Sequence, residues 1–249
     1  MKEKICIVIP THNNESEIGV ALEKALAFSD CVIVVDSSTD RTPKEIKKFR
    51  KAILLREKPG KGNQVRRGIT EALGKKCGFI ALVDGDGERE PADLNLMLAA
   101  LEENQAGICI GDREKMRSIR RKVLNLFSTA WINFATGFGL QDAQSGFILG
   151  KREAFEKMKL ESKNFEIETE IVLEAFKQKL TVCQAPVRSP KFSPSKCSKA
   201  RMVEINAFFD TWVLEHLDEL GFSAPKKAFL WLACNAGLAF SRAFQKCFL

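Results

Sequence analysis

Short runs of apolar residues, many of them β-branched, alternate with amphipathic segments along the first part of the chain. The apolar runs lie at 5–9, 31–35, 52–55, 79–83 and 107–111. Between these runs, apolar residues are spaced as in a helix. These segments lie over about 18–28, after Pro43, over about 64–74 and from Pro91 to about 103. Apolar runs of this length indicate strands buried on both faces. Their alternation with helices predicts an α/β fold, with helices on both faces of a mainly parallel sheet.

The alternation changes after residue 111. The pattern then predicts a helix over 113–136 that is first basic and then apolar, a strand at 147–149, a helix over 165–178 and a strand at 181–187. A basic loop over 188–201 follows, and from residue 204 onward the spacing is helical and increasingly apolar. The sequence therefore predicts one domain over 1–203 and a helical extension over 204–249.

Composition narrows the class of protein. The 249 residues carry a net charge of +7, which favours an anionic partner such as a nucleotide, a phosphorylated substrate, a nucleic acid or a membrane surface. The absence of Tyr and of any aromatic–basic interleaved motif argues against a nucleic-acid binder. Eight Cys without a CxxC pair indicate buried thiols in a reducing compartment. With no signal-peptide pattern at residues 1–4, we expect a cytoplasmic protein.

Carboxylates follow two of the predicted strands. Asp36 ends the second apolar run, and Asp84 and Asp86 follow the fourth in the segment Asp84-Gly85-Asp86-Gly87-Glu88. Ligands of parallel sheets bind beyond the carboxyl ends of the strands, so these side chains are expected to line one crevice. Hard oxygen ligands of this kind suit Mg²⁺ or Mn²⁺. A surface acidic turn that caps the next helix is the alternative.

Two nucleotide-binding motifs are missing. No GxxxxGK[ST] sequence is present, which excludes a P-loop, and no GxGxxG follows the first strand. The missing glycine-rich loop also argues against a nucleotidyltransferase.

Six segments in the same order resemble the motifs of family 2 glycosyltransferases. They match the opening P-x-Y-N-E, the V-D-D-G-S-x-D-x-T segment, a Lys-Gly pair, the D-A-D-x-Q metal motif, D-x-x-S-G-F and the F-x-x-x-x-E helix start. The segments are 10–15, 34–42, 61–62, 84–88, 142–147 and 165–170. Within this family, the polyprenyl-phosphate (dolichyl-phosphate) mannose and glucose synthases look most similar. The chain departs from the pattern at His12, Ser37 and Glu88.

The resemblance implies the GT-A fold and a metal-assisted, inverting transfer of mannose or glucose. The donor would be a GDP- or UDP-sugar and the acceptor a polyprenyl (dolichyl) phosphate; the alternative is a soluble hydroxyl or glycan acceptor. Asp84, Asp86 and Glu88 would hold Mg²⁺ or Mn²⁺. The donor would be bound by Pro10, His12, Glu15, Asp36, Lys61, Asp84 and Lys199.

Candidate catalytic residues depend on the acceptor. A hydroxyl acceptor needs a carboxylate base, for which Asp142 and Glu170 are the candidates, whereas a phosphate acceptor is already ionised. Arg113 opens a basic stretch suited to the acceptor phosphate. Ser198-Lys199 resembles the end of the family's flexible loop over the donor. We interpret Asp40 as a turn residue, and Glu166 and Glu168 as helix-surface residues.

The tail over 228–249 is apolar but interrupted by polar residues. Its uninterrupted apolar part is shorter than the ~20 residues that span a bilayer. Phe229, Leu232 or Ala233, Ala236, Phe240 and Phe244 share one helix face. Such a helix either lies on a membrane surface, here the cytoplasmic face, or packs against the domain or a partner chain. The sequence leaves the choice open, and with it the question of a homo-oligomer.

Overall fold

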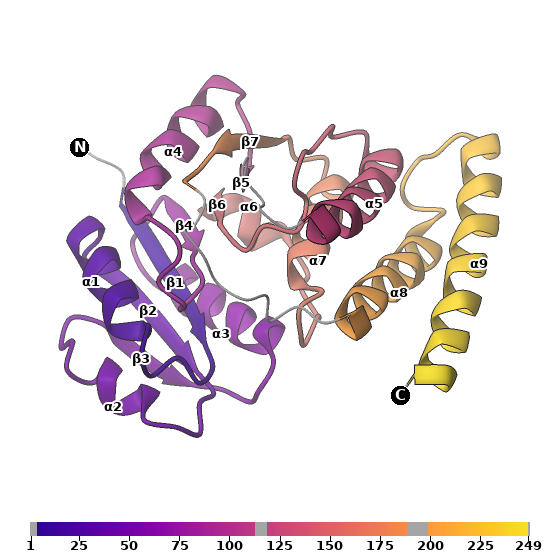
Figure 1. Cartoon of the computed structure of the whole chain (residues 1–249). Coiled ribbons are helices and arrows are strands. Elements are labelled where there is room, and N and C mark those ends of the chain that lie inside the picture. Colours follow the sequence, from indigo (N-terminus) through magenta and orange to yellow (C-terminus); the bar gives the residue numbers. More distant parts are fainter. Residues whose placement is uncertain (1–3, 113–118, 189–198, 249) are drawn as a thin grey trace.

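The computed structural model contains one seven-stranded sheet in the order β3-β2-β1-β4-β6-β5-β7 (Figure 1). The structure describes residues 4–112, 119–188 and 199–248, and it describes side chains for these except 119–127, 199–202 and 243–248. The strands are β1 (Ile5–Thr11), β2 (Cys31–Asp36), β3 (Ile53–Arg56), β4 (Phe79–Leu82), β5 (Ile108–Asp112), β6 (Ile148–Lys151) and β7 (Val182–Pro186). The predicted α/β class is confirmed.

Helices connect the strands. They are α1 (Ile18–Phe28), α2 (Thr42–Ile46), α3 (Lys61–Leu73), the 3₁₀ turn η1 (Pro91–Asp93), α4 (Leu94–Glu103), α5 (Ile119–Thr136), α6 (Arg152–Lys157), α7 (Ile167–Lys177), α8 (Lys199–His216) and α9 (Ala224–Phe248). The predicted helix over 18–28 coincides with α1. The short helix α6 is absent from the sequence prediction, since its six residues are too few for helical periodicity to stand out.

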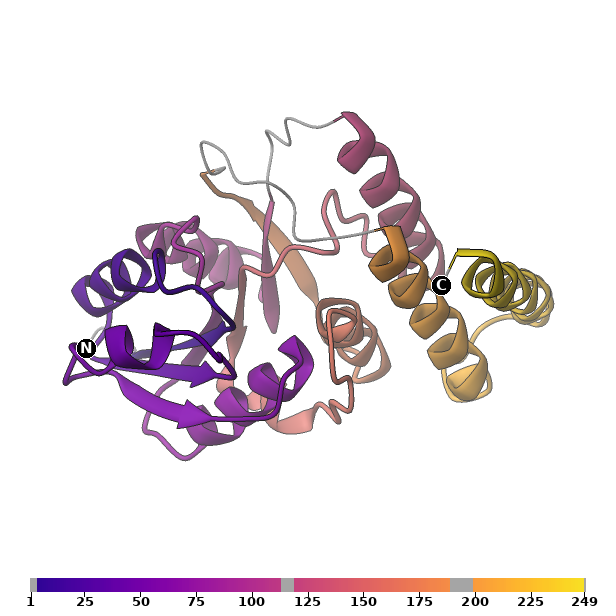
Figure 2. The same ribbon diagram turned by 60° about the horizontal axis from the view of Figure 1, so that its bottom comes forward.

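The sheet is covered on both faces because its strands are apolar on both faces. On β1, Ile7 and Ile9 pack with α1 and α4, whereas Cys6 and Val8 point to the opposite side. That second side is covered by α3 and α7, with α5, α8 and α9 beyond them (Figure 2). The carboxyl ends of β1, β2 and β4 therefore meet at one edge between two helical layers.

Strand β6 runs antiparallel to both of its neighbours, β4 and β5. The remaining pairs are parallel. Because β6 is reversed, the chain enters it at the edge where β4 ends. The segment before β6, including Ser145, Gly146 and Phe147, is thus brought to the carboxyl ends of the other strands.

The C-terminal segment differs from the prediction in two ways. Helix α8 begins at Lys199, within the segment predicted to be a basic loop, and the helical region is broken between His216 and Ala224. For α9, the sequence leaves open whether the face of Phe229 and Phe240 packs against the domain. In the structure these two residues are exposed, and Leu230, Cys234 and Ser241 are buried.

Helices α8 and α9 share the core of the domain. Phe209, Trp212 and Val213 of α8 belong to the same buried cluster as the sheet residues, as do Leu230 and Cys234 of α9. The rings of Trp131 and Phe134 on α5 pack against Phe229 of α9. Among the helices that the structure describes, none combines the length and apolar character needed to cross a membrane.

A close approach of helix α3 to the sheet generates a stability prediction. A Cβ atom on Gly68 of α3 would lie 2.2 Å from Val8 Cγ1, in the middle of β1. We expect Gly68→Ala to lower the free energy of unfolding by about 1–3 kcal/mol through overpacking. Gly19→Ala on α1 is the matched control, since nothing lies within 4 Å of its Cβ position. It should stabilise by up to ~1 kcal/mol. Equal effects of the two variants in urea unfolding would contradict this packing.

Candidate active site

The candidate site lies where three loops and the start of β6 meet. The backbone N–H of Ser37, after β2, donates to the carbonyl of Thr11 at the end of β1 (3.1 Å). A Cβ on Gly85, after β4, would lie 2.9 Å from Thr11 Cβ. A Cβ on Gly146, before β6, would lie 2.7 Å from Asp84 Oδ2. The structure thus brings the motifs after β1, β2 and β4 together with the Ser-Gly-Phe segment.

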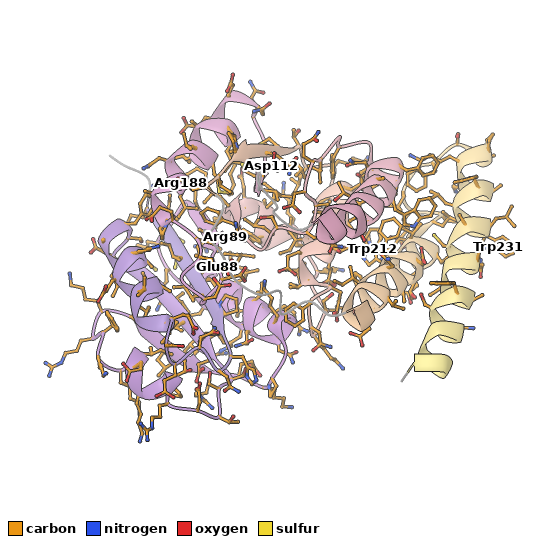
Figure 3. All side chains as sticks on the ribbon, in the orientation of Figure 1. Glu88, Arg89, Asp112, Arg188, Trp212 and Trp231 are labelled. Carbon is orange, nitrogen blue, oxygen red and sulfur yellow. The ribbon has the colours of Figure 1, made fainter. Side chains whose placement is uncertain are left out.

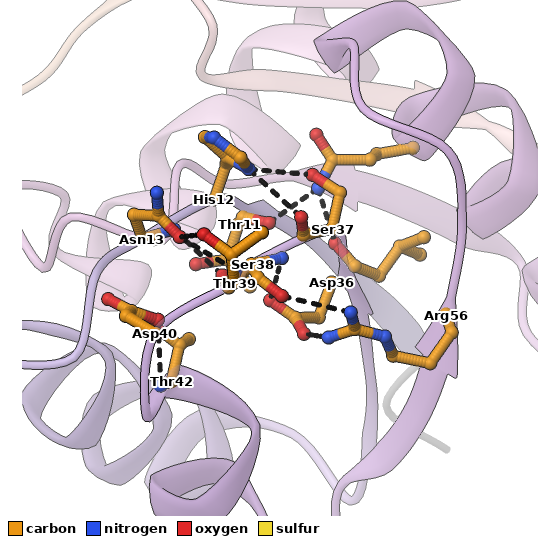
Figure 4. A network of polar contacts seen from close by, with 12 residues as sticks. Thr11, His12, Asn13, Asp36, Ser37, Ser38, Thr39, Asp40, Thr42 and Arg56 are labelled. Atoms are coloured by element: carbon orange, nitrogen blue, oxygen red, sulfur yellow. Dashed lines mark hydrogen bonds and ion pairs between the residues drawn. The ribbon is translucent and has the colours of Figure 1, made fainter.

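Asp36 is fully buried and fixed by two partners (Figure 4). Its Oδ1 accepts the backbone N–H of Ser38 (3.1 Å), and its Oδ2 forms an ion pair with Arg56. Arg56 lies opposite Asp36 in the pairing of β2 with β3, and it also donates to the Ser38 carbonyl (2.9 Å). The pair holds the loop after β2 in one shape.

The loop after β1 is hydrogen-bonded to the loop after β2. His12 is exposed, and its Nδ1 lies 3.0 Å from Ser37 Oγ and 3.1 Å from the Ser37 carbonyl. Asn13 bonds Ser38 Oγ and the N–H of Thr39. His12 and Asp36, which the sequence assigns to the donor, therefore belong to one network.

Three further predicted residues lie around this network. Pro10 is buried in β1, and the exposed Glu15 accepts the backbone N–H of Arg41 (3.3 Å). Asp40 Oδ1 accepts the backbone N–H of Thr42 (2.9 Å), which confirms its interpretation as a turn residue.

Lys61, at the first position of α3, lies between two carboxylates. Its Nζ is 2.6 Å from Asp84 Oδ1 and 2.5 Å from Glu168 Oε1. The Lys61 side chain is 15% exposed and that of Glu168 is 8% exposed. Burial by itself lowers the pKa of Lys61, but the charges of Asp84 and Glu168 outweigh it and raise this pKa. Burial raises the pKa of Glu168, and the charge of Lys61 opposes that rise.

Gly146 is required beside this cluster. A Cβ at this position would lie 2.7 Å from Asp84 Oδ2 and 2.8 Å from Lys61 Nζ. Any side chain here would push the ammonium and the carboxylate apart. The glycine of the predicted D-x-x-S-G-F motif therefore serves the approach of the β6 segment to Asp84.

Asp86 and Glu88 continue the acidic turn after β4. The backbone N–H of Glu88 donates to Asp86 Oδ1 (3.0 Å). Burial raises the pKa of Asp86 to about 6, and the negative charge of Asp84 adds to that rise. Across the described residues, no three His, Cys, Asp or Glu side chains are arranged to hold a metal ion. Asp84 and Asp86 nevertheless place hard oxygen atoms at the strand edge, a donor set that fits Mg²⁺ or Mn²⁺.

Glu170, a predicted catalytic base, instead holds a backbone segment. Its carboxylate accepts the N–H groups of Glu161 (2.8 Å) and Ser162 (3.0 Å). Glu166, one turn earlier, accepts those of Lys163 and Asn164, and Glu174, one turn later, accepts that of Lys159. We call Glu166, Glu170 and Glu174 the glutamate ladder. It fixes residues 159–164 along α7.

The segment fixed by the ladder in turn abuts the start of α3. The carbonyl of Lys163 accepts the N–H of Asn63 (3.1 Å). A Cβ on Gly60, which has φ of +121°, would lie 2.3 Å from that same carbonyl oxygen. A Cβ on Gly62 would lie 2.3 Å from the Ser162 carbonyl oxygen. Glycines on both sides of Lys61 therefore permit the contact that places its side chain.

Asp142 is buried in the turn that leads to Ser145 and β6. Its Oδ1 accepts the backbone N–H of Gln144 (3.2 Å), and its carbonyl accepts Gln184 Nε2 (3.2 Å). Its position four residues before Gly146 is compatible with the predicted place near the reaction, which stays a prediction.

Two of the predicted basic residues cannot be placed. Arg113 and the side chain of Lys199 lie outside the described residues. Arg188, at the start of the predicted basic loop, is described (labelled in Figure 3), and its guanidinium pairs with Asp93 at 2.7 Å.

Sequence reasoning missed three residues that support the site. Interpreting Glu168 as a helix-surface residue is wrong, because its carboxylate is buried against Lys61. Arg56 fixes Asp36. Its position as a basic residue at the end of the neighbouring strand is the sequence signal from which this pairing could have been predicted. Gln64 of α3 donates through Nε2 to the carbonyls of Thr11 (2.5 Å) and Val35 (2.8 Å), thereby joining the ends of β1 and β2.

Comparison with protein families gives one match relevant to this site. A family model described as glycosyl transferase family 2 matches residues 6–159. The match includes the loops after β1, β2 and β4, Lys61 and the Ser-Gly-Phe segment.

Curated relatives carry glycosyltransferase names. The glycosyltransferase AglJ of Haloferax volcanii is 29% identical over an alignment of 191 residues that covers 74% of this chain and 62% of AglJ. The dolichyl-phosphate beta-glucosyltransferase of Dictyostelium discoideum is 24% identical over an alignment of 225 residues that covers 77% of this chain and 68% of the relative. The chain thus spans less than two thirds of the length of AglJ.

A solved structure shares the fold. Glucosyl-3-phosphoglycerate synthase from Mycobacterium tuberculosis, in complex with Mn²⁺, uridine-diphosphate-glucose and phosphoglyceric acid, superposes with a TM-score of 0.67 at 18% identity. The likeness covers 89% of this chain and 81% of that one. The expected GT-A fold is thereby confirmed.

The acidic turn generates a prediction about titration. We expect Asp86 to titrate at about 6, and Asp84→Asn to lower this pKa, because one neighbouring negative charge is removed while burial remains. Folding raises this pKa above its ordinary 3.8. Protonated Asp86 therefore contributes to the stability of the fold at low pH, and this contribution is lost as the pH rises through about 6. Carbon-detected NMR of the aspartate carboxyl groups measures both values. An Asp86 pKa near 3.8 in both proteins would contradict the arrangement.

Proposed function

Because this chain belongs to glycosyl transferase family 2, we propose that it transfers mannose or glucose from a nucleoside-diphosphate donor to a polyprenyl phosphate, with inversion at the sugar. The observation that carries the proposal is the charged cluster of Asp84, Lys61 and Glu168 at the carboxyl ends of the strands. The name of the Dictyostelium discoideum relative, a dolichyl-phosphate beta-glucosyltransferase, supports the acceptor class.

Asp84 and Asp86 would hold a Mg²⁺ or Mn²⁺ ion, with Glu88 beside them. Their carboxylates suit these cations, and Asp84 already attracts the ammonium of Lys61 (2.6 Å). When bound, the ion would neutralise charge on the departing nucleoside diphosphate as a Lewis acid. The complex of glucosyl-3-phosphoglycerate synthase with Mn²⁺ and uridine-diphosphate-glucose supports this choice of ion and donor. Lys61 would add a fixed positive charge at the same edge.

The nucleoside would bind over the network of His12 and Asp36. The pairing of Asp36 with Arg56 and Ser38 fixes the loop on which a base or ribose would rest. Pro10 sets the exit from β1, and Glu15 braces the neighbouring loop through the N–H of Arg41. We also assign Lys199 to donor binding, because Ser198-Lys199 resembles the end of the family's loop over the donor.

The acceptor decides which residues the chemistry needs. A polyprenyl phosphate attacks as an anion, so that no strong base is required and Asp142 would orient the reactants. A soluble hydroxyl acceptor would need Asp142 as the base, because Glu170 is engaged with backbone N–H groups. Arg113 keeps the role of binding the acceptor phosphate on the strength of the sequence.

A lipid acceptor makes a membrane contact part of the proposal, and α9 offers the surface. Trp231 (53% exposed), Leu232 (63%) and Phe240 (67%) lie on α9, with Trp231 on the side away from α8 (Figure 3). The helix contains four Lys or Arg residues and no Asp or Glu, although Lys227 is paired with Asp218 and Lys226 donates to the carbonyl of Ala135 (3.0 Å). This charge suits an anionic lipid surface, whereas two copies facing each other would bring like charges together.

The reaction is tested by a donor screen. Purified protein is incubated with GDP- and UDP-sugars and Mn²⁺, with a polyprenyl phosphate or with 3-phosphoglycerate, and the nucleoside diphosphate released is measured. We expect release from one donor only when the lipid phosphate is present. Asp84→Asn should lower kcat/KM about a hundredfold or more. Asp30→Asn, an exposed carboxylate in the turn before β2, is the matched control. Release driven only by the soluble acceptor would contradict the lipid proposal.

The membrane contact is tested by vesicle binding. We expect vesicles of phosphatidylcholine and phosphatidylglycerol to blue-shift the emission of Trp231, the most exposed of the three Trp residues. Leu232→Glu should weaken binding by about tenfold or more, because burial of a Leu side chain contributes ~1.5–3 kcal/mol. Leu96→Glu, an equally apolar exposed site on α4, should bind like the wild type. Dimerisation that Leu232→Glu abolishes, without vesicle binding, would overturn the proposal.

A further inference from the structure

Glu168 belongs to the charged cluster of the site, but the function proposed above gives it no role of its own. It comes from the first turn of α7, whereas Asp84 follows β4 and Lys61 begins α3. The ammonium of Lys61 contacts both carboxylates, at 2.6 Å from Asp84 and 2.5 Å from Glu168. Three separate elements therefore meet in one ion-pair cluster.

We propose that Glu168 is a positioning residue that holds Lys61 when Asp84 turns to the divalent cation. The inference rests on the proposed function, which gives Asp84 to Mg²⁺ or Mn²⁺. In the cluster as it stands, one carboxylate has two potential cationic partners, the lysine and the metal. Glu168 is a second carboxylate, and it allows the site to hold the lysine and the metal ion at the same time.

The charge balance of the buried site requires such a second partner. A buried ammonium that loses its counter-charge is strongly destabilised. If Glu168 were neutral, Lys61 would depend on Asp84 alone, and the lysine would compete with the metal for the same oxygen atoms. With Glu168 ionised, Asp84 can leave the lysine without stranding it.

The surroundings of Glu168 suit a fixed anchor. The glutamate ladder ties α7 to residues 159–164, and these residues abut Gly60 and Gly62 at the start of α3. The ring of Phe165 lies 5.9 Å from Lys61 Nζ on the α7 side of the cluster. The Lys61–Glu168 contact therefore joins two elements that are already held together, whereas Asp84 lies directly before the turn Gly85-Asp86-Gly87.

The retained lysine would also serve the donor. A Lys61 held by Glu168 keeps its positive charge beside Asp84 and Gly146, at the edge where the diphosphate would bind. Glu168 thus acts through Lys61 and needs no contact with substrate.

Lysine acylation tests whether Glu168 holds Lys61 without help from Asp84. Sulfo-NHS-acetate labelling of the metal-free chain is followed by mass spectrometry, with exposed Lys58 as the internal reference. In Asp84→Asn, which removes one counter-charge, Lys61 should be labelled within about threefold of the wild-type rate; adding Glu168→Gln should raise the rate by about tenfold or more. Rapid labelling in Asp84→Asn alone would overturn the proposal. Glu153→Gln, an exposed carboxylate on α6, is the matched control.

Mn²⁺ binding in the presence of UDP tests the exchange, that is, the replacement of Lys61 by the metal ion as the partner of Asp84. Free Mn²⁺ is measured by EPR. Glu168→Gln should weaken Mn²⁺ binding by about tenfold, and adding Lys61→Met should restore it to within about twofold of Lys61→Met alone, because the competing lysine is gone. Equal loss in Glu168→Gln and the double variant would overturn the proposal, since Glu168 would then act on the metal or the fold directly.

The two proposals fail differently. If wild-type protein binds no Mn²⁺ with UDP present, Asp84 has no cation to turn to, and both the metal assignment and the exchange fall. If the Mn²⁺ and labelling results hold but no sugar is transferred to a polyprenyl phosphate, the exchange stands and only the proposed reaction fails.

Discussion

A buried positive charge held between two carboxylates governs the candidate site. Lys61 is placed inside the protein at the carboxyl ends of β1 and β4, and Asp84 and Glu168 supply its counter-charges. Either carboxylate can neutralise the ammonium, so that the cluster as a whole carries an excess negative charge that a divalent cation at Asp84 would offset. The same arrangement explains why Gly146 stands beside the cluster, where any side chain would separate the charges.

The rest of the fold can be understood as the support for this arrangement. The sheet brings the ends of β1, β2 and β4 to one edge, and the reversed strand β6 brings Gly146 to that edge. The glutamate ladder fixes residues 159–164, and Gly60 and Gly62 let this segment approach α3. On the far side of β1, Arg56 holds Asp36 in the same way that Glu168 holds Lys61. Asp36 and Lys61 are thus each fixed by a neighbour that comes from another element.

The sequence predicts much of this fold because β-branched runs and their bounding turns are local signals. The positions of Asp36 and Asp84 at strand ends follow from the same signals. The sequence does not show whether Glu168 or Glu170 faces Lys61. Residues two positions apart on a helix point to nearly opposite sides, and residues 167–175 of α7 are all buried. Because α7 has no distinct polar face, the sequence pattern does not identify the glutamate that faces Lys61. The reversal of β6 and the inward face of α9 likewise depend on tertiary contacts that no local pattern carries.

The central claim is that Asp84 is shared between Lys61 and a divalent cation, with Glu168 keeping the lysine in place. The most direct measurement is a crystal structure of the chain with UDP and Mn²⁺, in which anomalous scattering locates the metal. We expect manganese at Asp84 and Asp86, and Lys61 Nζ within ion-pair distance of Glu168 but no longer of Asp84. Manganese bound elsewhere, or an Asp84 still paired with Lys61 in the loaded site, would contradict it.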